Sequence, residues 1–163
     1  MRRSLPAFLI AAALTMNAQQ TAWSIDPPTG AHVVLEAHGK GVQIYTCDGT
    51  KWLLKAPDAK LLDASGKVIG SHSAGPTWTL ADGGHVQGEL IASKPSPEAN
   101  SIPWLLLRAK AGSATGSLAT VAYIRRTETQ GGVAPTSGCQ SAAEAGKTAQ
   151  VPYTATYTFY SQQ

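Results

Sequence analysis

From residue 31 onward the chain is a succession of short β-forming runs, and this pattern limits its fold more than any other feature. Turn residues (Gly, Pro, Asp and Asn) separate the runs at intervals of about ten residues, as in antiparallel sandwiches and barrels. The runs are 32–37, 42–47, 51–55, 60–63, 68–72, 76–80, 85–92, 102–110, 117–127 and 152–160. We expect a single all-β domain, an antiparallel β-sandwich or β-barrel, and the pattern does not distinguish the two.

The last run shows the period-two alternation of a half-buried strand. Tyr153, Ala155, Tyr157 and Phe159 share one face, which we expect to point into the core. The other face has Thr154, Thr156, Thr158 and Tyr160. Helical signals are weak. The Ser-x-x-Glu pattern of residues 141–144 resembles a capping box and predicts about two turns of helix.

The first residues have the pattern of a secretory signal peptide. Arg2 and Arg3 precede an apolar run over 5–16, and small residues follow at Ala18 and Ala22. The apolar run is shorter than the roughly 20 residues that a membrane span needs. We expect residues 1–18 to be removed, with cleavage as late as residue 22, which leaves one β-rich domain over 23–163. A retained membrane anchor or a buried helix is the alternative.

Loss of this segment removes most of the chain's net charge. The full chain has 13 basic and 10 acidic residues, and two of the basic ones are Arg2 and Arg3, so the remainder carries 11 − 10 = +1. Arg125 and Arg126 are the only adjacent basic pair after the signal. Nucleic-acid binding needs a concentrated basic patch, so we expect no nucleic-acid partner.

The two cysteines, Cys47 and Cys139, predict one disulfide in an exported chain of this size. The bridge would close a loop of 139 − 47 = 92 residues. Two free thiols or a metal pair are the alternatives. The chain has no Cys-x-x-Cys motif and no histidine beside either cysteine, so we expect no metal site.

The sequence contains none of the common catalytic or cofactor motifs. Gly-x-Ser-x-Gly, the Walker A loop, His-Glu-x-x-His and Gly-x-Gly-x-x-Gly are all absent. We therefore assign no catalytic residue and no cofactor from the sequence.

One stretch has the composition of a small binding site. His72, Trp78, Asp82 and His85 would converge if their strands form a hairpin, which would combine an aromatic surface with a few polar groups. The alternative for Trp78 is core packing, and the alternative for the histidines is an ordinary surface or half-buried strand position. We predict that any ligand site lies around these four residues.

Four separated strings stand out: GVQIYTC (41–47), AGPTW (74–78), IPWLLL (102–107) and VPYTA (151–155). In this order they resemble one secreted bacterial and fungal family, catalogued as domain of unknown function 3455. The resemblance covers about residues 27–160. It implies a secreted β-rich domain and brings no reaction, cofactor or catalytic residue, while the glycines and proline of 131–135 ahead of Cys139 support the disulfide pairing.

Together these features favour an exported, non-catalytic domain, periplasmic or secreted, that binds a small molecule, glycan or surface polymer. One alternative is a secreted hydrolase or isomerase that uses His72 or His85 with Asp82. Another is a structural or stress-protective envelope protein.

Intact-mass spectrometry of periplasmic or culture fractions tests the predicted export. The mature chain should begin near Gln19 or Trp23, because the basic start and the apolar run match a cleavable signal. A full-length mass in those fractions would contradict cleavage.

Overall fold

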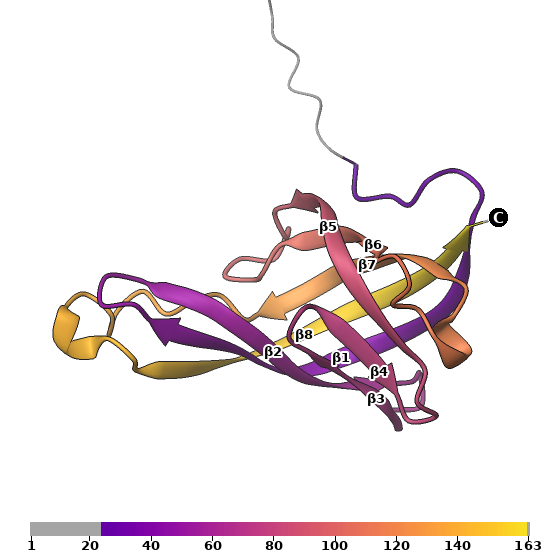
Figure 1. Cartoon of the computed structure of the whole chain (residues 1–163). Helices are drawn as coiled ribbons and strands as arrows, with labels where there is room; N and C mark the ends of the chain where they lie inside the picture. Colours follow the sequence, from indigo (N-terminus) through magenta and orange to yellow (C-terminus); the bar gives the residue numbers. More distant parts are fainter. Residues whose placement is uncertain (1–23, 163) are drawn as a thin grey trace, which may run out of the picture.

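The computed structural model describes residues 24–162, which form one antiparallel sheet of eight strands closed into a barrel (Figure 1). Of the two architectures that the sequence allows, the barrel is therefore the one adopted. The strands are β1 (Ala31–Cys47), β2 (Trp52–Leu62), β3 (Val68–Ser73), β4 (Thr77–Leu80), β5 (His85–Lys94), β6 (Trp104–Ala109), β7 (Val121–Gly131) and β8 (Thr148–Gln162). Two short 3-10 turns, η1 (Gly116–Leu118) and η2 (Ala142–Glu144), lie in the connections that precede β7 and β8.

The connectivity is that of an up-and-down barrel. Each strand pairs with the next in sequence, and β1 returns to pair with β8 from Ala31–Gln162 to Thr46–Thr148. Because β1 and β8 pair with each other, the first and last strands are not free edges of the sheet.

The ten runs of the sequence become eight strands because two predicted breaks do not occur. The break expected around 38–41 lies inside β1. A Cβ on Gly39 would lie 2.5 Å from the Tyr157 ring, and one on Gly41 would lie 2.1 Å from the Asp58 carbonyl oxygen. These glycines therefore permit close packing and do not make a turn. The break expected between 55 and 60 likewise lies within β2.

Two other boundaries differ from the expectation. The run 117–127 begins as η1 and becomes strand only at Val121. The two-turn helix expected near 141–144 is the single 3-10 turn η2, in which the Ser141 side chain makes no capping hydrogen bond to the backbone. The Glu144 carboxylate instead accepts a hydrogen bond from the backbone N–H of Gln140.

The expected inward face of β8 is confirmed. Tyr153, Ala155, Tyr157 and Phe159 are each at most 3% exposed. They pack inside the barrel with side chains from the other strands, so one continuous core fills most of the interior. Its other large members include Leu61, Trp78, Val86, Leu107, Leu118 and Ile124.

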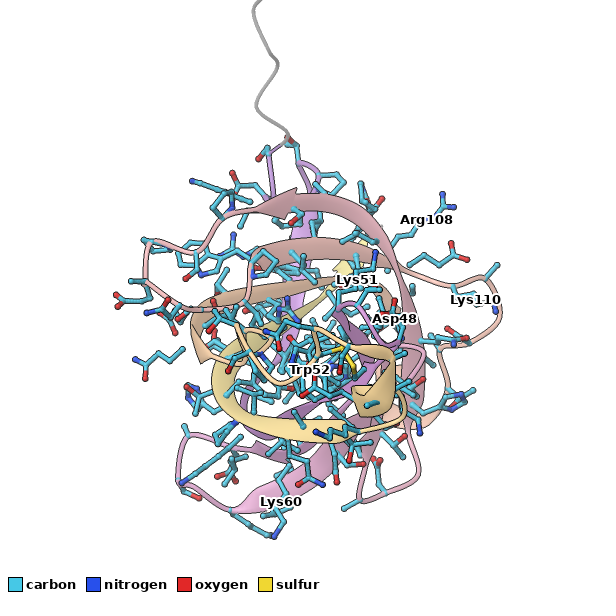
Figure 2. All side chains as sticks on the ribbon, turned by 90° about the vertical axis from the view of Figure 1, so that its left-hand side faces the viewer. Asp48, Lys51, Trp52, Lys60, Arg108 and Lys110 are labelled. Carbon is cyan, nitrogen blue, oxygen red and sulfur yellow. A yellow bond between two sulfur atoms is a disulfide. The ribbon has the colours of Figure 1, made fainter. Side chains whose placement is uncertain are left out.

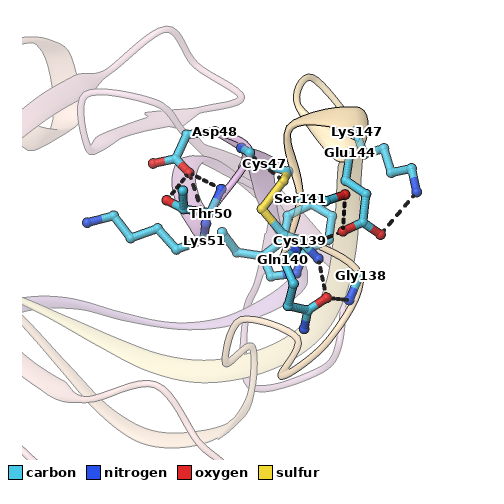
Figure 3. Close-up of a disulfide and its surroundings, with 12 residues drawn as sticks. Cys47, Asp48, Thr50, Lys51, Gly138, Cys139, Gln140, Ser141, Glu144 and Lys147 are labelled. Carbon is cyan, nitrogen blue, oxygen red and sulfur yellow. Dashed lines mark hydrogen bonds and ion pairs between the residues drawn. A yellow bond between two sulfur atoms is a disulfide. The ribbon is translucent and has the colours of Figure 1, made fainter.

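Strands β1, β2 and β8 extend beyond the shorter strands and form an arm at one end of the barrel (Figure 1). Figure 2 looks onto the tip of this arm, where Asp48 and Trp52 lie. The predicted disulfide is present: Cys47 at the end of β1 is bonded to Cys139 in the β7–β8 connection (Figure 3). The Trp52 indole N–H also donates to the Ser137 carbonyl, at 2.9 Å.

The segment before β1 packs on the outside of the barrel. Ile25 joins Ala92 and Leu106 in a second, smaller apolar cluster. Asp26 forms an ion pair with Arg125, at 3.0 Å. The lead-in therefore covers outward-facing side chains of β5, β6 and β7.

Within residues 24–162, no helix has the length and apolar character needed to cross a membrane. The predicted signal peptide, residues 1–18, lies outside the described part of the chain.

Loss of the disulfide should destabilise the domain. Cys139→Ala should lower the free energy of unfolding by about 2–5 kcal/mol, because the bridge restricts a 92-residue loop in the unfolded chain. Urea unfolding followed by tryptophan fluorescence measures this. Reductant should lower the stability of the wild type by a similar amount and leave the variant unchanged. Equal stability of the oxidised wild type and the variant would contradict the prediction.

Candidate functional site

A cavity of about 450 Å³ lies at the mouth of the barrel interior, where the arm of β1 and β2 passes the shorter strands, and opens to solvent beside the exposed Leu54 and Leu90. Strands β1, β2, β3, β5, β6 and β7 all contribute to its wall, together with the turn between β3 and β4. Most of the wall is apolar. The apolar side chains include Leu54, Pro57, Pro76, Leu90, Ile102 and Leu105.

The buried polar side chains of this cavity are few. They are Gln43 and Tyr45 of β1, His72 of β3 and Arg126 of β7. All four residues pair with a residue of a neighbouring strand, so the sheet fixes the backbone from which each side chain projects. An apolar cavity with a few convergent polar groups is the usual form of a small-molecule site.

His72 is the one predicted site residue that lines the cavity. It is 3% exposed, and its Nδ1 lies 2.9 Å from the Thr77 carbonyl oxygen. A carbonyl can only accept, so Nδ1 carries the proton and Nε2 is left as an acceptor. Burial, opposed by the hydrogen bond to Thr77 and assisted by the Arg126 charge, lowers the pKa of His72 to about 4. The ring is therefore neutral at pH 7.

Trp78 lies beside His72 but does not line the cavity. The two rings stack with centroids 4.4 Å apart and an interplanar angle of 10°. Trp78 is 1% exposed and meets Tyr157 and Phe159 edge-on, at 5.6 Å and 5.9 Å. Trp78 is therefore a core residue, and its ring packs against the His72 imidazole.

Asp82 and His85 are not brought to this cavity. The Asp82 carboxylate accepts from the Gly84 backbone N–H at 2.9 Å, and this bond is the main cause of its lowered pKa. His85 Nδ1 lies 2.8 Å from the Thr115 hydroxyl. Neither residue lines the cavity, so the predicted set of four divides into His72 with Trp78 and two residues at the β4–β5 turn.

Arg126 is a site residue that the sequence argument did not single out. It is 9% exposed, and its Nε and Nη2 donate to the Pro103 carbonyl at 3.1 Å and 2.8 Å. The adjacent Arg125 points outward to Asp26. Strand alternation could have indicated this position. Residues two apart on a strand point to the same face, and Arg126 is two residues from Ile124, whose side chain is fully buried in the core.

Gln43 and Tyr45 were also missed. Gln43 is 2% exposed, and its Oε1 has no hydrogen-bond partner among the described residues. The Tyr45 hydroxyl donates to the Gly132 carbonyl at 2.6 Å, and burial raises its pKa. Both share the inward parity of Gly39 on β1, so a polar side chain at an inward position was the signal in the sequence.

Comparison with known families gives one match. Residues 27–161 match the family described as "Protein of unknown function (DUF3455)". The chain belongs to this family. No curated protein and no solved structure matches it.

The DUF3455 fold here offers no metal-binding cluster within residues 24–162: no group of three or more His, Cys, Asp or Glu side chains could hold an ion. The chemistry of the cavity is instead that of a neutral imidazole, an amide, a phenol and a guanidinium beside apolar walls.

The buried imidazole predicts a pH dependence of stability. Between pH 6.5 and about 4 the unfolded chain binds a proton at His72 that the folded protein does not, so stability should fall as pH falls. The full effect is about 3 kcal/mol. Urea unfolding at pH 7, 6, 5 and 4.5 measures it.

The slope of stability against pH is the informative quantity, because His72→Gln also removes the stacking on Trp78. His72→Gln should flatten the slope, and His32→Gln, at an exposed position on β1, should leave it unchanged. Equal slopes in the wild type and His72→Gln would contradict the prediction.

Proposed function

We propose that this DUF3455 domain is an exported, non-catalytic protein that binds a small molecule in its barrel cavity. The observation that carries the proposal is the 450 Å³ cavity, with apolar walls and buried polar groups provided by Gln43, His72 and Arg126. Ligand sites typically have volumes of about 300–1,000 Å³ and this division between apolar wall and polar anchor. Eight-stranded barrels also have room for one small ligand.

The nature of the wall favours a small molecule over a glycan or surface polymer. A glycan needs many polar partners and exposed aromatic rings on which its sugar faces can lie. The cavity offers mainly Leu, Ile and Pro side chains, and Trp78, the aromatic residue considered for that role, is buried in the core.

The distribution of carboxylates favours binding over catalysis by an acid–base pair. The enzyme alternative requires His72 or His85 beside a carboxylate such as Asp82. Asp82 and His85 lie outside the cavity, and no Asp or Glu is among its described lining residues. His72, with a pKa of about 4, is also a weak base at neutral pH.

The Cys47–Cys139 disulfide supports the exported location. Disulfides of this kind persist in oxidising compartments and are rare in the reducing cytosol. The predicted signal peptide supports the same location.

Binding of the neutral fluorescent probe N-phenyl-1-naphthylamine tests the cavity. The mature, oxidised protein should bind one probe molecule, with a blue-shifted and stronger emission. Ala56→Phe should weaken binding by about tenfold or more, because Ala56 lines the cavity and a phenyl ring there would fill it.

Leu53→Phe is the matched control. Leu53 lies on the same strand, is 47% exposed and does not line the cavity, so the substitution should leave probe affinity unchanged. Failure to bind the probe, or equal weakening by the two substitutions, would contradict binding in the cavity.

A further inference from the structure

The cavity contains a buried cation that lacks a counter-charge. None of the ion pairs among residues 24–162 includes Arg126, although its side chain is 9% exposed. Its described hydrogen-bond partners are both neutral: the Pro103 carbonyl and the Tyr157 hydroxyl. A buried charge is costly unless an opposite charge or several hydrogen bonds compensate for it.

The other lining residues provide no negative charge to balance Arg126. Lys55 is the other charged residue of the wall, and no Asp or Glu lines the cavity in the described chain. Asp58, the nearby acidic residue of β2, is exposed and does not line the cavity. The cavity therefore has positive charge and no negative charge of its own.

The Arg126 guanidinium has N–H donors that can bind an anion. Of its five N–H donors, two point to the Pro103 carbonyl and one serves the Tyr157 hydroxyl, so two remain. An arginine fork matches the two oxygens of a carboxylate, and such charge-assisted pairs are among the stronger hydrogen bonds.

A second, independent observation also points to a ligand. The Gln43 side chain is 98% buried, lines the cavity and has an Oε1 without a partner. This oxygen needs a donor, as does Nε2 of His72, whose other nitrogen is committed to Thr77. A ligand hydroxyl or amide N–H would satisfy either acceptor.

We propose that the ligand is a small organic acid whose carboxylate pairs with Arg126 and whose apolar body lies against Leu54, Ile102 and Leu105. This inference rests on the proposed function and specifies the ligand class for the same cavity. Lys55 is exposed, so Arg126 is the one buried cation of the described wall and balances one negative charge, which favours a monocarboxylate over a phosphate dianion.

Phenylacetate and phenylacetone provide a matched pair of probes, since the ketone keeps the approximate size and shape of the acid, removes its charge and brings no N–H or O–H donor for Gln43 or His72. Isothermal titration calorimetry on the mature, oxidised protein at pH 7 should show that the acid binds about tenfold or more tightly.

Arginine substitutions assign this preference to one side chain. Arg126→Gln should remove the preference for the acid, and Arg126→Lys should retain part of it, because lysine keeps the charge and loses the fork. Arg125→Gln is the matched control. Arg125 is the preceding residue, faces outward to Asp26 and should leave the preference unchanged.

The outcomes separate the two proposals. Equal affinities for acid and ketone in the wild type would overturn the organic-acid inference and leave cavity binding standing. No binding of either compound, together with no binding of N-phenyl-1-naphthylamine, would overturn the proposed function as well. The wild-type comparison needs no substitution, so it decides the inference even if Arg126→Gln does not fold.

Discussion

The pairing of β1 with β8 is the interaction on which the rest of the structure depends. It joins the two ends of the chain over fifteen residue pairs and converts a meander into a closed barrel. Closure creates an interior, and the core and the cavity are two parts of it. The pairing needs a glycine at position 39, because the Tyr157 ring fills the space that a Cβ would occupy. Closure of the whole sheet therefore depends on one glycine of β1.

Within this interior, the core prepares the polar end of the cavity. Trp78, held between Tyr157 and Phe159, presents a flat surface on which His72 stacks. The Thr77 carbonyl then fixes the imidazole tautomer. Burial and the charge of Arg126 both disfavour a protonated His72. The result is a fixed neutral acceptor on the same cavity wall as a permanent cation.

The sequence was sufficient for the fold class because alternation over 153–159 and the spacing of turn residues are local properties. It could not separate sandwich from barrel, since that depends on whether β1 and β8 meet. The site was harder to predict for the same reason. Adjacent Arg125 and Arg126 look alike in sequence, and only the closed sheet decides which one is inside. Asp82 and His85 were grouped with His72 by proximity in the chain, but hydrogen bonds to Gly84 and Thr115 hold them at a turn.

The disulfide also helps to fix one wall of the cavity. The bridge fixes the β7–β8 connection against the end of β1, and the bond from Trp52 to Ser137 fixes it to β2. Tyr45, two residues before Cys47, lines the cavity and donates to Gly132 at the start of the same connection. The connection is thus held at the arm tip and at the cavity. An oxidising environment that maintains the bridge would also keep this wall in place, so the proposed binding role depends on the covalent link that supports the proposed export.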